Sequence, residues 1–156
     1  IQIAKILGAR VTAVSSRRNE GFVRDLGADA VLPHDEAPLV ERDARFDAVF
    51  DVFGTAPFAK ARRLLAPGGR YVTAIPRPDS VARDLASRVV PGIDAHLVLV
   101  RSRTRDLARL AQWIDEGELR CVVDAVYPIE EAARAHEHVE TRRTRGKVVL
   151  EVASRA

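Results

Sequence analysis

Sulfur-containing residues are almost missing from this 156-residue sequence, which has one cysteine and no methionine. The lone Cys121 cannot form a disulfide within the chain, which favours a reducing, cytoplasmic setting. It also excludes a structural zinc site built from four cysteines. An apolar helical pattern begins at Ile1 with no capping residue before it, so we expect the chain to be a piece of a longer protein, cut inside a helix.

Long apolar runs and a strong excess of one charge are also missing. No stretch approaches the roughly 18 apolar residues that a membrane-spanning helix requires, and the N-terminus lacks a signal-peptide pattern. The 25 Lys and Arg residues nearly balance the 22 Asp and Glu residues. Because nucleic-acid-binding surfaces usually carry one continuous basic face, we expect no nucleic-acid partner. Because no long apolar run is present, we also expect no membrane partner.

Apolar runs of strand length alternate with segments of helical period along the chain. The runs predict strands at residues 11–14, 30–32, 46–54, 70–75, 96–100, just after Cys121 and at residues 147–152. Helices are predicted up to Gly8, from Asn19 to Gly27, across residues 56–66, from Thr104 to Gly117 and from Pro128 onwards. The continuous 46–54 run predicts a strand buried on both faces, whereas the segment from Pro76 to about Gly92 is rich in proline and arginine and is assigned no element.

This alternation predicts the α/β fold class, with a Rossmann-like, doubly wound, mostly parallel sheet and helices on both faces. A chain of 156 residues is long enough for one such domain with its own core. Ligands of doubly wound sheets bind beyond the carboxyl ends of the strands. Candidate binding residues are therefore expected at positions 15–18, 32–35, 53–55 and 74–77.

Two arginines, Arg17 and Arg18, directly precede a predicted helix, together with Ser15 and Ser16. The positive end of a helix dipole disfavours a nearby cation by a few tenths to about 1 kcal/mol. A bound phosphate would reverse this effect, because hydroxyls, backbone N–H groups and guanidinium groups all donate to it. After the second strand of a dinucleotide-binding unit, an arginine can accommodate a 2′-phosphate, so this position favours NADP(H). The alternative is that both arginines are solvated surface groups.

Several stretches resemble one known superfamily, in the same order along the chain. They are "IQIAKILGARVTAVSSRRNEGFVRDLGADAVL", "FDAVFDVFG", "ARRLLAPGGRYVTAIP" and, most specifically, "YPIEEAARAHEHVETRRTRGKVVL". They resemble the medium-chain dehydrogenase/reductase superfamily, in its zinc-independent quinone oxidoreductase branch. The resemblance implies that residues 1–156 form a truncated NADP(H)-binding Rossmann domain, without the glycine-rich loop and the N-terminal substrate domain. It also implies that the segment from about 120 to 156 packs back toward that substrate domain.

The same resemblance suggests further cofactor-binding residues. His34 would lie beside the 2′-phosphate and adenine, although a solvated loop histidine is an equal alternative. Phe53, Gly54 and Thr55 would line the path from adenosine to nicotinamide, and Ala74, Ile75 and Pro76 the nicotinamide side. For Gly54 a plain turn, and for Ile75 a core position, are the alternatives. The strand at residues 96–100 resembles an edge strand through which relatives form homodimers.

No catalytic residue and no metal site is predicted. His136 and His138 are two positions apart on a predicted helix, about 200° around its axis, so they cannot face one ion. We expect both to be surface residues. Asp47 is expected at a strand boundary, and Asp51 is expected to lie near the cofactor or to be bonded internally.

The resemblance implies NADPH-dependent reduction of a quinone or an α,β-unsaturated carbonyl compound, a small-molecule substrate, by a metal-independent oxidoreductase. We expect this chain alone to be inactive. An alternative is a class I methyltransferase that uses S-adenosylmethionine, because "FDAVFDVFG" followed by "LLAPGGRYV" also resembles that family. However, that family normally carries a glycine-rich loop and then an acidic residue at the end of the strand that follows it. Ser15, Ser16 and Arg17 do not fit this pattern. A non-enzymatic cofactor-binding or dimerisation module is a further alternative.

Overall fold

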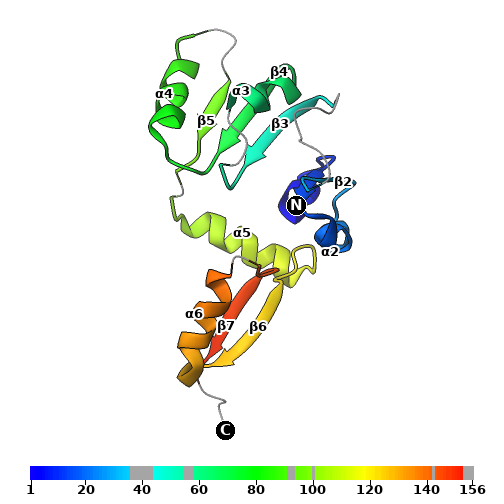
Figure 1. Cartoon of the computed structure of the whole chain (residues 1–156), viewed down its shortest axis with the longest axis vertical. Helices are drawn as coiled ribbons and strands as arrows, with labels where there is room; N and C mark the ends of the chain where they lie inside the picture. Colours follow the sequence, from blue (N-terminus) through cyan, green and yellow to red (C-terminus); the bar gives the residue numbers. More distant parts are fainter. Residues whose placement is uncertain (36–43, 55–57, 91–93, 100, 142, 153–156) are drawn as a thin grey trace. The chain divides into compact units, whose positions relative to one another are not determined.

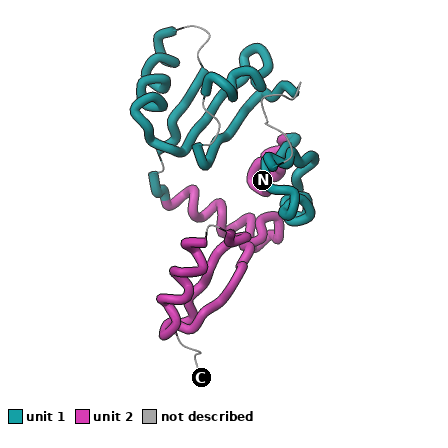
Figure 2. The backbone as a smooth tube through the Cα atoms, in the orientation of Figure 1, with its two compact units in different colours: residues 1, 10–103 teal, residues 2–9, 104–156 magenta. Residues whose placement is uncertain are grey.

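The computed structural model describes residues 1–35, 44–54, 58–90, 94–99, 101–141 and 143–152. The chain forms two compact units, which Figure 2 distinguishes by colour. The first unit contains residue 1 and residues 10–103, and the second contains residues 2–9 and 104–156. Among the described residues, no helix is both long and apolar enough to cross a membrane.

The first unit begins with a parallel pair of strands, β1 (Thr12–Ser15) and β2 (Ala30–Pro33). A single 3-10 turn, η1 (Arg17–Asn19), and the helix α2 (Glu20–Asp25) connect them. Small and branched apolar residues form the core between the helix and the strands, namely Ala13, Val23 and Ala28. This connection leaves residues 16–19 at the carboxyl end of β1.

The rest of the first unit is a three-stranded parallel sheet with the order β3-β4-β5 (Figure 1). Its elements are β3 (Phe46–Asp51), α3 (Phe58–Ala61), η3 (Arg62–Leu64), β4 (Leu65–Thr73), α4 (Pro78–Ser87) and β5 (Ala95–Leu97). Its core contains Ala61, Tyr71 and Ala95, with Phe58 packed edge-on against the Tyr71 ring. Leu64, at 1% exposure, is its most completely buried large side chain.

The second unit contains a third parallel sheet, formed by the two strands β6 (Val123–Pro128) and β7 (Lys147–Glu151). Its helical elements are α1 (Gln2–Ile6), α5 (Thr104–Asp115), η4 (Ile129–Glu131) and α6 (Ala132–Glu140). The side-chain amide of Gln2 joins α1 to the segment after α5, since it donates to the Arg120 carbonyl at 3.0 Å and accepts the Arg120 N–H at 2.8 Å.

The strand pairs confirm the predicted α/β class, because every pair is parallel and helices connect the strands. Three predicted helix ends are also confirmed. Gly8, Gly27 and Gly117 follow α1, α2 and α5 with φ angles of +81°, +97° and +75°. Only glycine adopts this left-handed conformation without a steric cost, so the sequence marks these ends clearly.

One predicted helix of the first unit differs from the structure, and one helix was not predicted. The helix predicted across residues 56–66 is shorter, because β4 already begins at Leu65 and runs through the Pro-Gly-Gly sequence. Its register against β3 shifts between Phe46 and Ala48 to accommodate the extra residues. Conversely, the segment after Pro76 contains the ten-residue helix α4. Pro78 occupies its first turn, and the Ser80 hydroxyl oxygen accepts the Arg77 N–H at 2.9 Å.

Two strand predictions also differ from the structure. The strand predicted at residues 96–100 is β5, which ends at Leu97. The strand predicted at residues 46–54 ends at Asp51 and is not buried on both faces, since Phe50 is 63% exposed. Its apolar run therefore indicated a strand correctly but overestimated its burial.

Because β4 lies close to β3 at Gly69, a methyl group added at this position should destabilise the folded state. A Cβ atom there would lie 2.8 Å from the Phe46 carbonyl oxygen, a backbone atom that cannot move alone. We expect Gly69→Ala to lower the free energy of unfolding by about 1–3 kcal/mol, as overpacking usually does. Gly21→Ala is the matched control, because Gly21 lies in α2 with no atom within 4 Å of the added Cβ. This control should raise the unfolding free energy by about 0.5 kcal/mol. Urea unfolding followed by circular dichroism measures both, and equal values for the two variants would contradict the packing argument.

Candidate functional site

The predicted phosphate-binding residues lie at the carboxyl ends of β1 and β2. The His34 N–H donates to the Ser15 carbonyl at 3.0 Å, which brings the two strand ends together. The Ser15 hydroxyl donates to the Ser16 carbonyl at 3.2 Å. Arg17 and Arg18 belong to the 3-10 turn that follows, and both are exposed, as is His34. The structure therefore gathers the five residues predicted there on one edge.

An acid to which the sequence analysis gave no role, at the end of the predicted range 32–35, lies in the same place. Both carboxylate oxygens of Asp35 accept the backbone N–H of Arg17, at 3.0 and 3.2 Å. A second carboxylate, that of Glu20, lies 3.9 Å from the Arg17 Nε atom. The unfavourable placement of two arginines before a helix is thus offset by two acids. The signal in the sequence was the position of Asp35, two residues beyond the end of β2.

A second group of residues is organised around Asp51 at the carboxyl end of β3. Asp51 is 7% exposed, and its two carboxylate oxygens accept different donors. Oδ1 accepts the Gly54 N–H at 2.8 Å, and Oδ2 accepts the Tyr71 hydroxyl at 3.0 Å. The internally bonded alternative for Asp51 is therefore confirmed. Burial, followed by the hydrogen bond to Asp51 and the charge of Asp51, raises the pKa of the Tyr71 hydroxyl above its usual range.

The turn that follows Asp51 brings Gly54, predicted on the path from adenosine to nicotinamide, close to Ile75, predicted on the nicotinamide side. Gly54 has a φ of +67°, and a Cβ atom there would lie 3.2 Å from Ile75 Cγ1 and 3.4 Å from the Arg77 guanidinium. The Ile75 backbone is fixed on both sides, because its N–H donates to the Thr73 hydroxyl at 3.2 Å and its carbonyl accepts the Ser80 hydroxyl at 3.0 Å. Arg77 and Ser80 are additions that sequence reasoning did not single out.

The remaining predicted residues are less constrained. The Ala74 N–H donates to the Asp51 carbonyl at 3.3 Å, which continues the pairing of β4 with β3. Phe53 is 82% exposed and Pro76 is also exposed. Thr55 lies outside the described residues. Exposure of an aromatic ring beside a strand end is compatible with a ligand-stacking role, but it is not evidence for one, so these assignments stay predictions.

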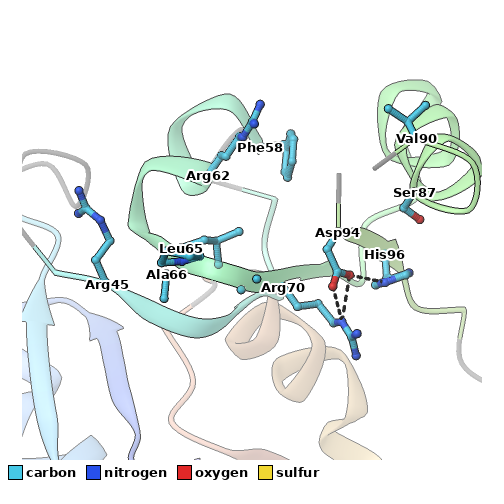
Figure 3. Close-up of a pocket in the computed structure, with 13 residues that line it drawn as sticks. Arg45, Phe58, Arg62, Leu65, Ala66, Arg70, Ser87, Val90, Asp94 and His96 are labelled. Carbon is cyan, nitrogen blue, oxygen red and sulfur yellow. Dashed lines mark hydrogen bonds and ion pairs between the residues drawn. The ribbon is translucent and has the colours of Figure 1, made fainter. Parts of the chain in front are cut away.

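The main pocket of the described residues lies elsewhere. Figure 3 shows this pocket of about 790 Å³, which is lined by the amino-terminal half of β4, by Phe58 and Arg62, and by Asp94 and His96 of the β5 side. None of the predicted cofactor residues lines it. Its arginines Arg45, Arg62 and Arg70 do not converge on one point in Figure 3.

Three polar residues of that pocket, Arg70, Asp94 and His96, are bonded to one another. Arg70 Nε donates to Asp94 at 3.0 Å, and His96 Nε2 lies 2.6 Å from the same carboxylate. The hydrogen bond from Arg70, with a smaller contribution from His96, holds the pKa of Asp94 below its usual range. Since ligands of parallel sheets bind at the carboxyl ends of strands, the Arg17 group at the end of β1 and the Asp51 group at the end of β3 are the better candidates.

Metal ligands do not gather in the described part of the chain, where no three His, Cys, Asp or Glu side chains could hold one ion. The two histidines considered above differ in their surroundings. His136 is exposed as expected, whereas His138 is only 29% exposed and lies 3.2 Å from Asp124. A zinc ion therefore finds no ligand set among these residues.

Comparison with known proteins relates this chain to dehydrogenases and reductases at the level of family, sequence and structure. The model of the zinc-binding dehydrogenase family matches residues 26–150. A trans-enoyl reductase from Aspergillus terreus is 29% identical over 168 residues, covering 97% of this chain and 47% of the relative. The quinone oxidoreductase structure from Coxiella burnetii is 28% identical with a TM-score of 0.84, covering 98% of this chain and 48% of that one. These likenesses confirm the predicted Rossmann-like fold.

One similar structure contains a cofactor. It is a mycobacterial protein complexed with NADPH, 26% identical with a TM-score of 0.68, and the match covers 97% of this chain and 51% of that one. The chain spans about half the length of the curated relatives it matches.

The Asp51 carboxylate predicts an unusual titration of Tyr71. In a Tyr127→Phe background, where Tyr71 is the remaining tyrosine, its pKa should lie above the usual value of about 10. Asp51→Asn should lower it toward that value, because the negative charge is removed while burial remains. Since the folded-state pKa is the higher one, the unfolding free energy should fall as the pH rises above about 10. NMR of ¹³Cζ-labelled tyrosine measures the titration. An identical Tyr71 pKa with and without the Asp51 charge would contradict the assigned contact.

Proposed function

We propose a function from one premise: the chain belongs to the zinc-binding dehydrogenase family, which confirms the predicted relationship to the medium-chain dehydrogenases/reductases. The whole protein is an NADPH-dependent oxidoreductase that reduces a quinone or an α,β-unsaturated carbonyl compound. This chain is its cofactor-binding part. The quinone oxidoreductase and trans-enoyl reductase relatives support the substrate class, and the family match weighs against the methyltransferase alternative.

The observation that carries the cofactor proposal is the group at the end of β1. Arg17 and Arg18 belong to the turn that directly follows β1, next to Ser15 and Ser16, and an arginine at this point of a dinucleotide-binding unit can accommodate a 2′-phosphate. The Arg17 side chain is 64% exposed and its contact with Glu20 is 3.9 Å long. An exposed ion pair of this kind contributes little, so a phosphate dianion can compete with it. His34 adds a further possible donor to the same group.

The proposed contacts with the nicotinamide part of the cofactor involve the group of residues around Asp51. Gly54 and Ile75 lie close together there, and Phe53, Thr55, Ala74 and Pro76 complete the proposed contact surface. The cofactor supplies the hydride, while these residues bind and orient it. The described residues offer no metal ligand set, so the proposed reaction uses no zinc held by this part of the chain.

Three smaller proposals accompany this one. The isolated chain is inactive, because it spans only about half the length of the curated relatives that it matches. The segment from about residue 120 packs toward the substrate domain in the whole protein. The single, exposed Cys121 favours a cytoplasmic location.

Binding of adenosine fragments tests the cofactor preference. We expect the chain to bind 2′-phospho-AMP at least about tenfold more tightly than AMP, with an affinity that falls as salt is added. Arg17→Ala combined with Arg18→Ala should abolish the preference, and Asp35→Asn should increase it by removing a competing carboxylate. Arg105→Ala, an exposed arginine of α5, is the control and should change nothing. Isothermal titration calorimetry measures these affinities. Equal binding of both ligands would sink the NADPH proposal and favour NADH or a non-enzymatic module.

Homodimer formation through β5 is a separate proposal. β5 is the terminal strand of its sheet, and Val98 and Leu99, which follow it, are 42% and 64% exposed. Pairing two such edges across a two-fold axis would cover these apolar residues. We expect a dimer in sedimentation equilibrium, and Leu99→Lys should weaken it at least about tenfold by placing charges in the interface. A monomer at all concentrations, or a dimer indifferent to Leu99→Lys, would be evidence against this interface.

A further inference from the structure

In the second unit, the side chain of one histidine contacts a tyrosine through one ring nitrogen and an aspartate through the other. The Tyr127 hydroxyl lies 3.1 Å from Nδ1 of His138, and Nε2 of the same imidazole lies 3.2 Å from Oδ2 of Asp124. Tyr127 and Asp124 belong to β6, and His138 belongs to α6. The three residues are separated by up to 14 positions in the sequence, so no local motif reveals them.

The Asp124 carboxylate lies on the Nε2 side of the imidazole. A carboxylate oxygen that faces a ring nitrogen at 3.2 Å favours the imidazole proton on that nitrogen, Nε2. Nδ1 then has a free lone pair, and the Tyr127 hydroxyl must donate to it. The order is therefore hydroxyl, base and orienting acid, which is the arrangement that activates hydroxyl nucleophiles.

The surroundings of Tyr127 supply a positive charge and access for small molecules. The Arg134 guanidinium lies 5.9 Å from the Tyr127 ring centroid and is ion-paired with Glu131. This cation favours negative charge developing on the ring oxygen. The side chains of Asp124 and His138 are 22% and 29% exposed, and Tyr127 is also partly exposed.

From this geometry we propose that Tyr127 is a nucleophilic modification site for activated acyl groups, with His138 as its general base and Asp124 as the positioning residue. The Tyr127 oxygen forms a bond to the acyl carbon, and the bond from that carbon to its leaving group breaks. The hydroxyl proton passes to Nδ1 of His138 and then to the leaving group. The product is an aryl ester of Tyr127, and no oxidant or reductant takes part.

The same contacts also fasten α6 to β6, so the experiment must separate reactivity from stability. The probe is p-nitrophenyl acetate, applied to the full chain. Cys121→Ser serves as the background, because Cys121 is an exposed thiol that would react with the same ester. Peptide mass spectrometry gives the rate of acetylation at each tyrosine. Tyr71 is an internal control, since it is 6% exposed and its hydroxyl donates to Asp51.

We expect Tyr127 to be acetylated at least about tenfold faster than N-acetyltyrosine amide under the same conditions. His138→Gln should lower this rate at least about tenfold, and Asp124→Asn should lower it by a smaller factor, because the imidazole remains but loses its orienting acid. Tyr71 should stay unmodified in every variant, which shows that the first unit stays folded, while circular dichroism checks the fold of the second unit.

Three results would overturn the proposal. The first is acetylation of Tyr127 no faster than that of the model compound. The second is a folded His138→Gln variant that reacts as fast as the background protein. If His138→Gln unfolds, as judged by circular dichroism, Asp124→Asn provides the comparison, and an unchanged rate in that folded variant is the third. None of these outcomes depends on the proposed reductase activity.

Discussion

The buried Asp51 carboxylate is the interaction on which the candidate cofactor edge depends. It is one of the few charged groups in the core of the first unit, and both its oxygens are used. One oxygen holds the Gly54 N–H and the other holds the Tyr71 hydroxyl, so a single side chain ties the end of β3 to the neighbouring strand β4. A buried carboxylate without these donors would carry a large desolvation cost. The turn at Gly54, and its approach to Ile75, therefore follow from the need to satisfy Asp51.

The edge at the ends of β1 and β2 is organised by charge rather than by burial. Arg17 and Arg18 introduce positive charge beside a helix start, and the carboxylates of Asp35 and Glu20 both lie close to Arg17. The charges of the site are therefore balanced without a ligand. A bound phosphate must displace or lie beside the Asp35 carboxylate, which already accepts the Arg17 N–H, so a change at Asp35 should alter the ligand preference.

Much of the fold could be predicted from the sequence, because local signals agreed with it. Glycines that end helices, such as Gly8 and Gly117, mark positions where only a residue without Cβ is comfortable. The helix α4 was missed because its arginines and prolines obscured a sound start, with Pro78 in the first turn and Ser80 accepting the Arg77 N–H. The early start of β4 was missed because the Pro-Gly-Gly sequence was interpreted as the turn that ends the preceding helix, whereas it lies within β4 and a register shift accommodates it.

The candidate site was predictable only in part, for a physical reason. Residues at the ends of strands follow directly from the order of elements, so the groups near Arg17 and Gly54 could be anticipated. Contacts between distant segments could not, because no local pattern encodes them. Asp35 with Arg17, Tyr71 with Asp51, and His138 with Tyr127 and Asp124 all belong to this second kind.

The central claim is that the cofactor lies along the carboxyl ends of the strands of the first unit. Intermolecular nuclear Overhauser effects between NADP⁺ and the isotope-labelled chain test this most directly. The account predicts contacts from adenosine protons to Ser16 and Arg17, and from nicotinamide protons to Gly54 and Ile75. Contacts confined to the pocket at the opposite ends of β4 and β5, at Phe58 and Arg70 for example, would contradict it.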